Sequence, residues 1–319
     1  MRSVLHIARG ITFLCLGAAM PAACGAPPTA VAPSAPTLDN GAQMRAASSS
    51  GDLLYAGHGH NVEVYSFPGG TYQRTLKTTD SVNGMCSDSK GNVFVAEAQS
   101  DAGYVYEYAH GGTAPVATLS VPKPNTPIAC SIDPTTGNLA ITMQNSQNFA
   151  PSVGIYAKAT GTPEVYSLGE LGADPQGGYD DHGNLFVTSG GNVGAELPAG
   201  KTTFEKITLS KTIGGVGHVQ WDGTYFALQS FDASRHQGEY LYEEIFRVQI
   251  SGAAGKIVQT IAFRGWPEQD PGQSWIAGGS IVGTPFSDLL FWAYPAGGKV
   301  QKTLHPQHQV KAVTISAGD

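Results

Sequence analysis

Two short clusters of histidine could do chemistry in this chain. His58 and His60 lie in a Gly-His-Gly-His turn, and His305 and His308 precede the last apolar segment. Imidazole is a ligand of tetrahedral zinc, and the four rings could approach one another if the ends of the chain meet. However, no cysteine or carboxylate is spaced with them, and turns often carry histidine. We therefore predict no metal and treat His58, His60 and His308 as candidate ligand-binding residues.

A second set of candidates surrounds the segment 264–275, Arg-Gly-Trp-Pro-Glu-Gln-Asp-Pro-Gly-Gln-Ser-Trp. Aromatic rings beside fixed polar groups recognise sugars and peptides. Trp266, Gln273 and Trp275 are therefore candidate ligand-binding residues, although Trp266 could instead cover the edge of a sheet. The segment 231–242 is expected to be a neighbouring loop. His218, which starts an apolar strand, is a further candidate.

The composition indicates short strands joined by tight turns. Charged residues make up only 13% of the chain, and there are 41 glycines and 20 prolines, whereas globular proteins average about 25% charged residues. The formal net charge is −7 and the 18 basic residues are scattered singly, which excludes a nucleic-acid-binding surface. Beyond Thr29 no apolar stretch approaches the roughly 20 residues of a membrane span.

The N-terminus predicts export. Arg2 and Arg9 precede an apolar run and then small residues, the layout of a signal peptide over residues 1–23. The sequence Pro21-Ala-Ala-Cys24 resembles a bacterial lipobox, except that proline stands where leucine is usual. We favour lipidation of Cys24, with a Pro/Ala/Ser-rich tether over 24–51, and a periplasmic or surface location. Plain secretion after cleavage near Ala23 is the alternative.

The rest of the chain, 52–319, carries an internal repeat. An apolar strand, an aspartate turn with Gly-Asn or Gly, and a second apolar strand recur in four segments, whose key glycines are 46, 46 and 40 residues apart. Aspartate accepts backbone N–H groups in such turns, and Gly-Asn tolerates left-handed dihedrals. The four segments are 84–95, 129–141, 178–187 and 219–227.

A second marker, an apolar strand that closes in a glycine-rich turn, occurs six times and predicts six blades of four strands. The first unit, from Asp52, lacks an innermost strand, and the chain ends with a lone strand over 310–315. The fold class is therefore all-β, a six-bladed β-propeller closed by pairing the C-terminal strand with the N-terminal blade, which leaves no open edge.

The repeat also places two of the four cysteines. Cys86 and Cys130 occupy matching positions on the innermost strands of adjacent blades. Since export permits oxidation, we predict a disulfide between them; two buried free thiols are the alternative.

The segment Asp88-Ser-Lys-Gly-Asn-Val-Phe-Val-Ala96 resembles an NHL repeat, and Asp52-Leu-Leu-Tyr-Ala56 is similar to the YVTN variety. The resemblance covers roughly residues 52–316 and points to the gluconolactonase-like propeller superfamily. It implies a propeller that commonly binds a ligand or partner at its channel mouth. Calcium-dependent lactonases of that superfamily have a Glu-Gly-Pro segment in the first blade, which is absent here.

These observations lead us to predict a non-catalytic, monomeric binding module for a small-molecule, glycan or protein ligand at the channel mouth, with no cofactor. A metal-dependent, lactonase-like hydrolase is the alternative, with a calcium ion in the channel. Loop acids that could bind such a cation are Asp80, Asp101, Glu170, Asp174, Glu268 and Asp270, although they form no ordered ligand loop.

Overall fold

The computed structural model describes residues 51–318, except 100–101, 238–239, 266–271 and 285–286, and for residues 231–243 it describes the backbone alone. The predicted signal peptide, Cys24 and nearly all of the tether lie outside the described residues. Within the described part of the chain, no helix has the length and apolar character needed to cross a membrane.

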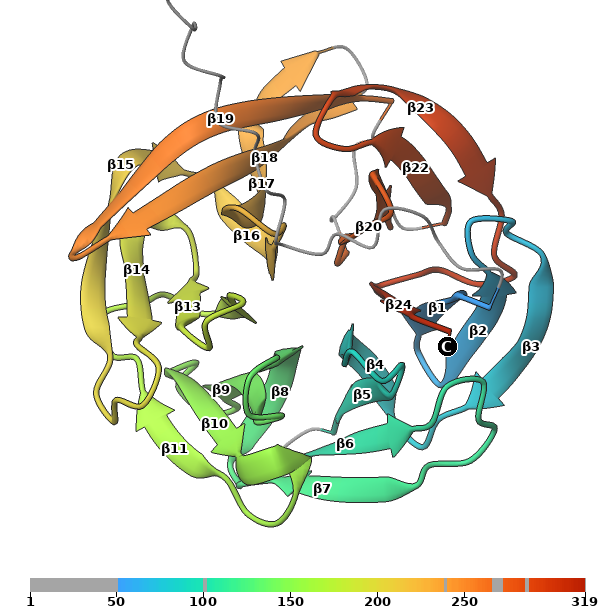
Figure 1. Ribbon diagram of the computed structural model, residues 1–319, viewed down its shortest axis with the longest axis horizontal. Helices are drawn as coiled ribbons and strands as arrows, with labels where there is room; N and C mark the ends of the chain where they lie inside the picture. Colours follow the sequence, from blue (N-terminus) through green and yellow to red (C-terminus); the bar gives the residue numbers. More distant parts are fainter. Residues whose placement is uncertain (1–50, 100–101, 238–239, 266–271, 285–286, 319) are drawn as a thin grey trace, which may run out of the picture. The chain divides into compact units, whose positions relative to one another are not determined.

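Among the described residues, the strands pair antiparallel in six groups of four, arranged as a ring (Figure 1). Blade 1 contains β24 (Ala312–Ser316), β1 (Leu53–His58), β2 (Asn61–Ser66) and β3 (Tyr72–Lys77). Blade 2 contains β4 (Ser81–Ser87), β5 (Val93–Ala98), β6 (Gly103–Tyr108) and β7 (Ala117–Val121). Blade 3 contains β8 (Asn125–Ile132), β9 (Leu139–Asn145), β10 (Pro151–Tyr156), the short 3₁₀ helix η1 (Ala157–Ala159) and β11 (Glu164–Ser167).

The remaining blades follow the same order. Blade 4 contains β12 (Gln176–Tyr179), β13 (Leu185–Thr188), β14 (Gly191–Leu197) and β15 (Glu205–Ile213). Blade 5 contains β16 (Gly215–Trp221), β17 (Phe226–Gln237), β18 (Tyr240–Ser251) and β19 (Ala254–Arg264). Blade 6 contains β20 (Trp275–Ala277), β21 (Ser280–Gly283), β22 (Leu289–Ala293) and β23 (Gly297–Leu304). The segment 231–242, expected to be a loop, is instead part of the long β17–β18 hairpin.

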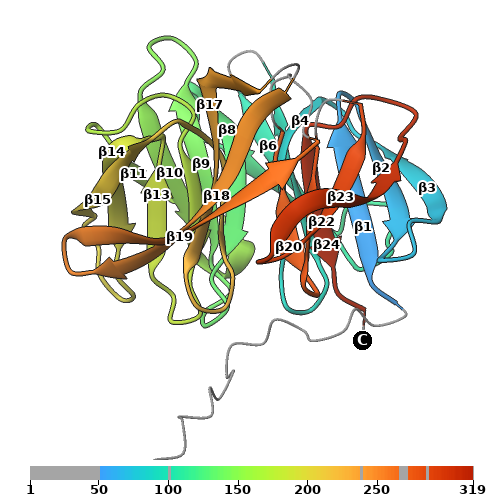
Figure 2. The ribbon, with the colours of Figure 1, turned by 90° about the horizontal axis from the view of Figure 1, so that it is seen from above.

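The two ends of the propeller meet in blade 1. β24 pairs antiparallel with β1, with Leu53 opposite Ser316 and Gly57 opposite Ala312. Further round the ring, the outer strand β19 pairs in parallel with β15 and with β23 (Figure 2). These contacts satisfy backbone groups that an exposed sheet edge would leave open.

The core consists of six buried apolar clusters, one at each junction between neighbouring blades of the described chain. At the junction of blades 2 and 3, for example, Phe94 and Val105 pack with Ile141 and Met143. Each blade therefore buries both faces of its sheet, which explains why the inner strands are continuously apolar.

The repeated aspartates organise the turns between the first two strands of blades 2 to 5. Asp88 accepts hydrogen bonds from the backbone N–H groups of Lys90 and Asn92, and Asp180 does the same for His182 and Asn184. The carboxylate thus replaces the partners that these donors lose where the chain reverses.

Two repeat glycines allow the innermost strands to approach closely. A Cβ atom on Gly84 would lie 2.5 Å from the carbonyl oxygen of Ile128, and one on Gly178 would lie 2.8 Å from that of Val219. Any side chain at either position would force neighbouring blades apart. Gly84 and Gly178 therefore allow the close spacing of these neighbouring strands.

Candidate binding site in the central channel

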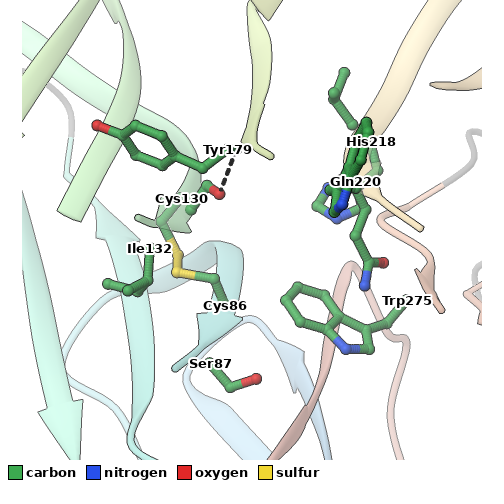
Figure 3. A pocket seen from close by; sticks show the side chains of 11 residues that line it. Cys86, Ser87, Cys130, Ile132, Tyr179, His218, Gln220 and Trp275 are labelled. Atoms are coloured by element: carbon green, nitrogen blue, oxygen red, sulfur yellow. Dashed lines mark hydrogen bonds between the residues drawn. A yellow bond between two sulfur atoms is a disulfide. The ribbon is translucent and has the colours of Figure 1, made fainter. Parts of the chain in front are cut away.

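The central channel contains a pocket near the carboxyl ends of the innermost strands. Its volume is about 140 Å³, and its walls come from β4, β8, β12, β16 and β20 (Figure 3). The side chains labelled in Figure 3 are Cys86, Ser87, Cys130, Ile132, Tyr179, His218, Gln220 and Trp275. Five different blades therefore contribute to one pocket.

His218 is the polar group that stands out in this pocket. It lies on β16 and is 3% exposed, and neither ring nitrogen has a hydrogen-bond partner among the described residues. Burial lowers the pKa of His218 to about 3, because the cation would lose its hydration. The ring is therefore neutral at pH 7 and offers one donor and one acceptor.

Trp275 supplies the aromatic surface beside His218. The two ring centroids are 5.7 Å apart, with 30° between the ring planes. In Figure 3 the indole and Gln220 lie on one side of the pocket, and the disulfide and Ile132 lie on the other. A flat group that enters this space would meet an aromatic face and neutral polar atoms, the combination that recognises sugars and peptide groups.

Cys86 and Cys130 form a disulfide across the wall between blades 2 and 3, with 5.6 Å between their Cα atoms. This is the pair that the repeat aligned. Its sulfur atoms line the pocket, so the bridge also holds β4 and β8 at a fixed separation there.

Three glutamines connect neighbouring segments around the channel through their side-chain amides. Gln220 bonds the backbone N–H and carbonyl of Ile276, while Gln229 bonds the Gly272 carbonyl and the Ser274 N–H. Gln273 bonds both backbone groups of Met85. Gln273 was predicted to bind ligand, but its amide is buried and both of its polar atoms are engaged in this structural contact.

The four clustered histidines separate into a pair and two single residues. His58 and His308 stack, with ring centroids 4.4 Å apart. His60 instead contacts the Thr79 carbonyl through Nδ1, and the exposed His305 pairs with Asp288. The predicted ligand residues His58 and His308 therefore lie together in blade 1, away from the pocket formed by His218 and Trp275.

The loop acids considered for a channel cation do not gather in the described structure. Asp80 accepts a hydrogen bond from Gln99, and Glu170 pairs with Lys206 at the surface. Two groups of histidine and acidic side chains come within 4.8 Å among the described residues, namely His58, Glu63 and His308, and Asp180, Asp181 and His182. Neither group includes these loop acids. Trp266, Asp101, Glu268 and Asp270 lie outside the described residues.

Two buried carboxylates, Glu63 and Glu97, were not predicted from the sequence. Glu63 is fully buried on β2 beside the paired histidines, and Glu97 is fully buried on β5. Thr79 and Asp80 donate backbone hydrogen bonds to Oε2 of Glu97, and burial raises the pKa of this carboxyl to about 7. Each glutamate interrupts a run of apolar residues within its strand, and this interruption is the only sign of the residue in the sequence.

Comparisons with known proteins identify the fold. No protein-family model and no curated protein matches the sequence. Among solved structures, the nidogen/laminin complex is similar, with a TM-score of 0.59 at 13% identity, covering 83% of this chain and 98% of that chain. A Bacteroides caccae protein of unknown function matches with a TM-score of 0.59 at 11% identity, covering 84% and 99%. TolB from Acinetobacter baumannii matches with a TM-score of 0.56 at 13% identity, and the match covers 84% of this chain and 67% of the TolB chain.

Strand pairing and these likenesses define the chain as a β-propeller, as the repeat predicted. At such low identity the likeness concerns the fold alone. The channel pocket and the blade 1 cluster must therefore be interpreted from their own chemistry.

Proposed function

We propose that this chain is an exported, non-catalytic binding module that receives one neutral group of a protein or glycan partner in its channel pocket. The observation that carries the proposal is His218, a buried neutral ring in the pocket wall whose two nitrogens have no hydrogen-bond partner among the described residues. Leaving such groups unsatisfied is costly, and a ligand with its own donor and acceptor would remove that cost.

The size of the pocket favours a partner that inserts a single group. Sites for drug-sized molecules occupy roughly 300–1,000 Å³, whereas this pocket has about 140 Å³. That space fits one side chain or one sugar-sized unit, so most of the binding surface would lie outside it. The similar structure of a nidogen/laminin complex shows that another propeller-like chain is found in a protein complex, which agrees with this proposal.

Titration with small neutral probes tests the proposal. N-acetylated amino-acid amides and methyl glycosides would be added while tryptophan fluorescence and the His218 ring ¹⁵N signals are recorded. We expect a saturable change with at least one probe, and we expect His218→Phe to abolish it, since phenylalanine keeps the ring but loses both nitrogens. His182→Phe, on an exposed turn, is the matched control. If no probe gives a saturable change that depends on His218, the pocket is not a binding site.

The alternative function, a metal-dependent hydrolase of lactones, makes a different prediction. It requires turnover of a lactone probe such as glucono-δ-lactone, and loss of that turnover on chelation. Turnover that persists in His218→Phe but stops with EDTA would replace the binding proposal with the enzymatic one.

Export and lipid anchoring at Cys24 are part of the same proposal and rest on the signal-like N-terminus and the lipobox-like segment. Mass spectrometry of the mature N-terminal peptide tests them. We expect a lipid-modified Cys24, and Cys24→Ala should release the protein from the membrane fraction. An unmodified peptide that starts near Cys24 would leave plain secretion.

A further inference from the structure

The cluster in blade 1 joins residues from both ends of the propeller. His58 ends β1, Glu63 lies on β2, and His308 lies in the segment between β23 and β24. His58 pairs with Asn61 across the hairpin, so Glu63, two residues further along β2, lies on the same face of the sheet. Ring closure then brings His308 to this face, 245 positions from Glu63.

One carboxylate oxygen faces both rings. Oε1 of Glu63 is 3.1 Å from Nδ1 of His308 and 4.0 Å from Nε2 of His58. The rings are nearly parallel, with 13° between their planes. The other oxygen, Oε2, accepts the hydroxyl hydrogen bond of Tyr65. The backbone N–H of Gln307 also donates to the carboxylate, 3.2 Å from Oε1. Tyr65 and Gln307 together fix the carboxylate beside the histidines.

His58 carries a buried ring nitrogen that lacks a hydrogen-bond partner among the described residues. This nitrogen is Nε2, and the residue is 7% exposed. An imidazole nitrogen without a proton presents a lone pair, and that is the form of imidazole that binds metals.

We propose that His58, Glu63 and His308 bind a divalent transition-metal ion, best matched by Zn²⁺, that clamps the closing strand of the propeller to its first hairpin. Two imidazoles and one carboxylate are a known zinc ligand set, and tetrahedral bonds of about 2.0–2.1 Å place ligand atoms roughly 3.3 Å apart. The three potential ligand atoms already lie within 4.8 Å of one another. Because a metal ion lies in the plane of each imidazole that binds it, at least one of the two stacked rings must rotate out of the stack to complete the geometry.

The exposure of the cluster suits a reversible site. The side chain of His308 is 47% exposed, whereas Glu63 is buried, so solvent reaches the cluster from one side only. Water can occupy the fourth position, and the ion can enter beside His308. Because the ligands come from β1, β2 and the segment before β24, the unfolded chain would not hold them together. Binding would therefore stabilise the closed ring.

Zinc stoichiometry on the purified full chain tests this proposal. The protein would be stripped with EDTA, loaded with Zn²⁺, dialysed and analysed for bound metal, and Co²⁺ loading would add a visible d–d spectrum that reports coordination by the protein. We expect about one Zn²⁺ per chain and a higher thermal midpoint with Zn²⁺ than with EDTA. Because His308 is exposed, His308→Ala should fold, bind Zn²⁺ at least about 100-fold more weakly and lose the thermal shift.

The matched control is His305→Ala, in the same connecting segment but paired with Asp288 outside the cluster. It should retain both the metal and the thermal shift. Glu63→Gln, which keeps the shape of the side chain, should alter the Co²⁺ spectrum. The proposal is overturned if the wild type binds no stoichiometric Zn²⁺, if His308→Ala binds it equally well, or if His305→Ala loses it. Those outcomes would leave Glu63 and His308 as an ion pair only.

Discussion

The side-chain amide of Gln273 bonds both backbone groups of Met85, 188 positions earlier in the chain: the Met85 N–H donates to Oε1 over 3.0 Å, and Nε2 donates to the Met85 carbonyl over 2.6 Å. Innermost strands of separate blades share no backbone ladder. The amide therefore acts in place of a short piece of strand and connects the start of blade 6 to blade 2.

Replacing Gln273 by methionine should destabilise the propeller. The buried N–H and carbonyl of Met85 would lose their partners, and each unsatisfied group costs about 1–3 kcal/mol. We expect the free energy of unfolding, measured by urea titration, to fall by about 2–6 kcal/mol. Gln301→Met, at an exposed position on β23, is the control and should change it by less than about 0.5 kcal/mol. Equal effects of the two variants would contradict the bridging role of Gln273.

Removing the Cys86–Cys130 disulfide should lower stability through the unfolded state. The bridge joins residues with a sequence separation of 44. It restricts the unfolded chain, and the lost conformational entropy stabilises the folded state by about 2–4 kcal/mol. Differential scanning calorimetry of Cys86→Ala/Cys130→Ala should show a lower Tm. A reductant should lower the wild-type Tm in the same way and leave the double variant unchanged; a reductant effect on the variant would point to another cause.

His218 should make the protein sensitive to acid. Its pKa is about 3 when folded and near the usual 6.5 when unfolded, so the unfolded chain binds more protons between these values. The contribution to stability is complete above pH 6.5 and is lost as the pH falls towards 3. The slope is at most about 1.4 kcal/mol per pH unit. Urea titrations from pH 7 to pH 4 should show this slope in the wild type, and His218→Phe should lack that component.

Glu97 should make the protein less stable as the pH rises, which is the opposite of the pH dependence expected for His218. Burial raises its pKa from 4.5 to about 7, so the folded chain binds more protons between these values. The stability associated with Glu97 is complete below pH 4.5 and is lost as the pH rises through 7. Glu97→Gln keeps an oxygen for the N–H groups of Thr79 and Asp80 but cannot ionise. The variant should gain stability relative to wild type at pH 8, and none at pH 4; a gain that is the same at both values would contradict this titration.

Much of the scaffold could be predicted because its signals are local. The aspartate turns depend on hydrogen bonds between residues two to four positions apart, such as Asp88 with Asn92, so they recur visibly in the sequence. The alignment of the repeated segments also placed Cys86 and Cys130 at matching positions in adjacent blades. His218 and Trp275 could each be selected as candidates, but their stacking required strands from two blades to be placed side by side.

The least predictable features were polar residues inside strands. Glu63 stands between Val62 and Val64, a pattern typical of a solvent-facing position on a half-buried strand. In the folded chain its face is covered by the segment that carries His308. The contact of Gln273 with Met85 could not be predicted for a related reason: Met85 lies on a strand that sequence spacing cannot bring near Gln273.

Local patterns in the sequence were enough to predict an all-β chain with repeated turns, periodic glycines and a first and last strand that complement each other, because each of these features depends on backbone conformation over a few residues. Which polar side chains have hydrogen-bond partners became clear only from the folded chain. Folding pairs Gln273 with Met85, leaves the buried ring nitrogens of His218 without a partner among the described residues, and brings His308 to Glu63. Those outcomes depend on contacts between strands that are far apart in sequence, and only closure of the ring brings such strands together.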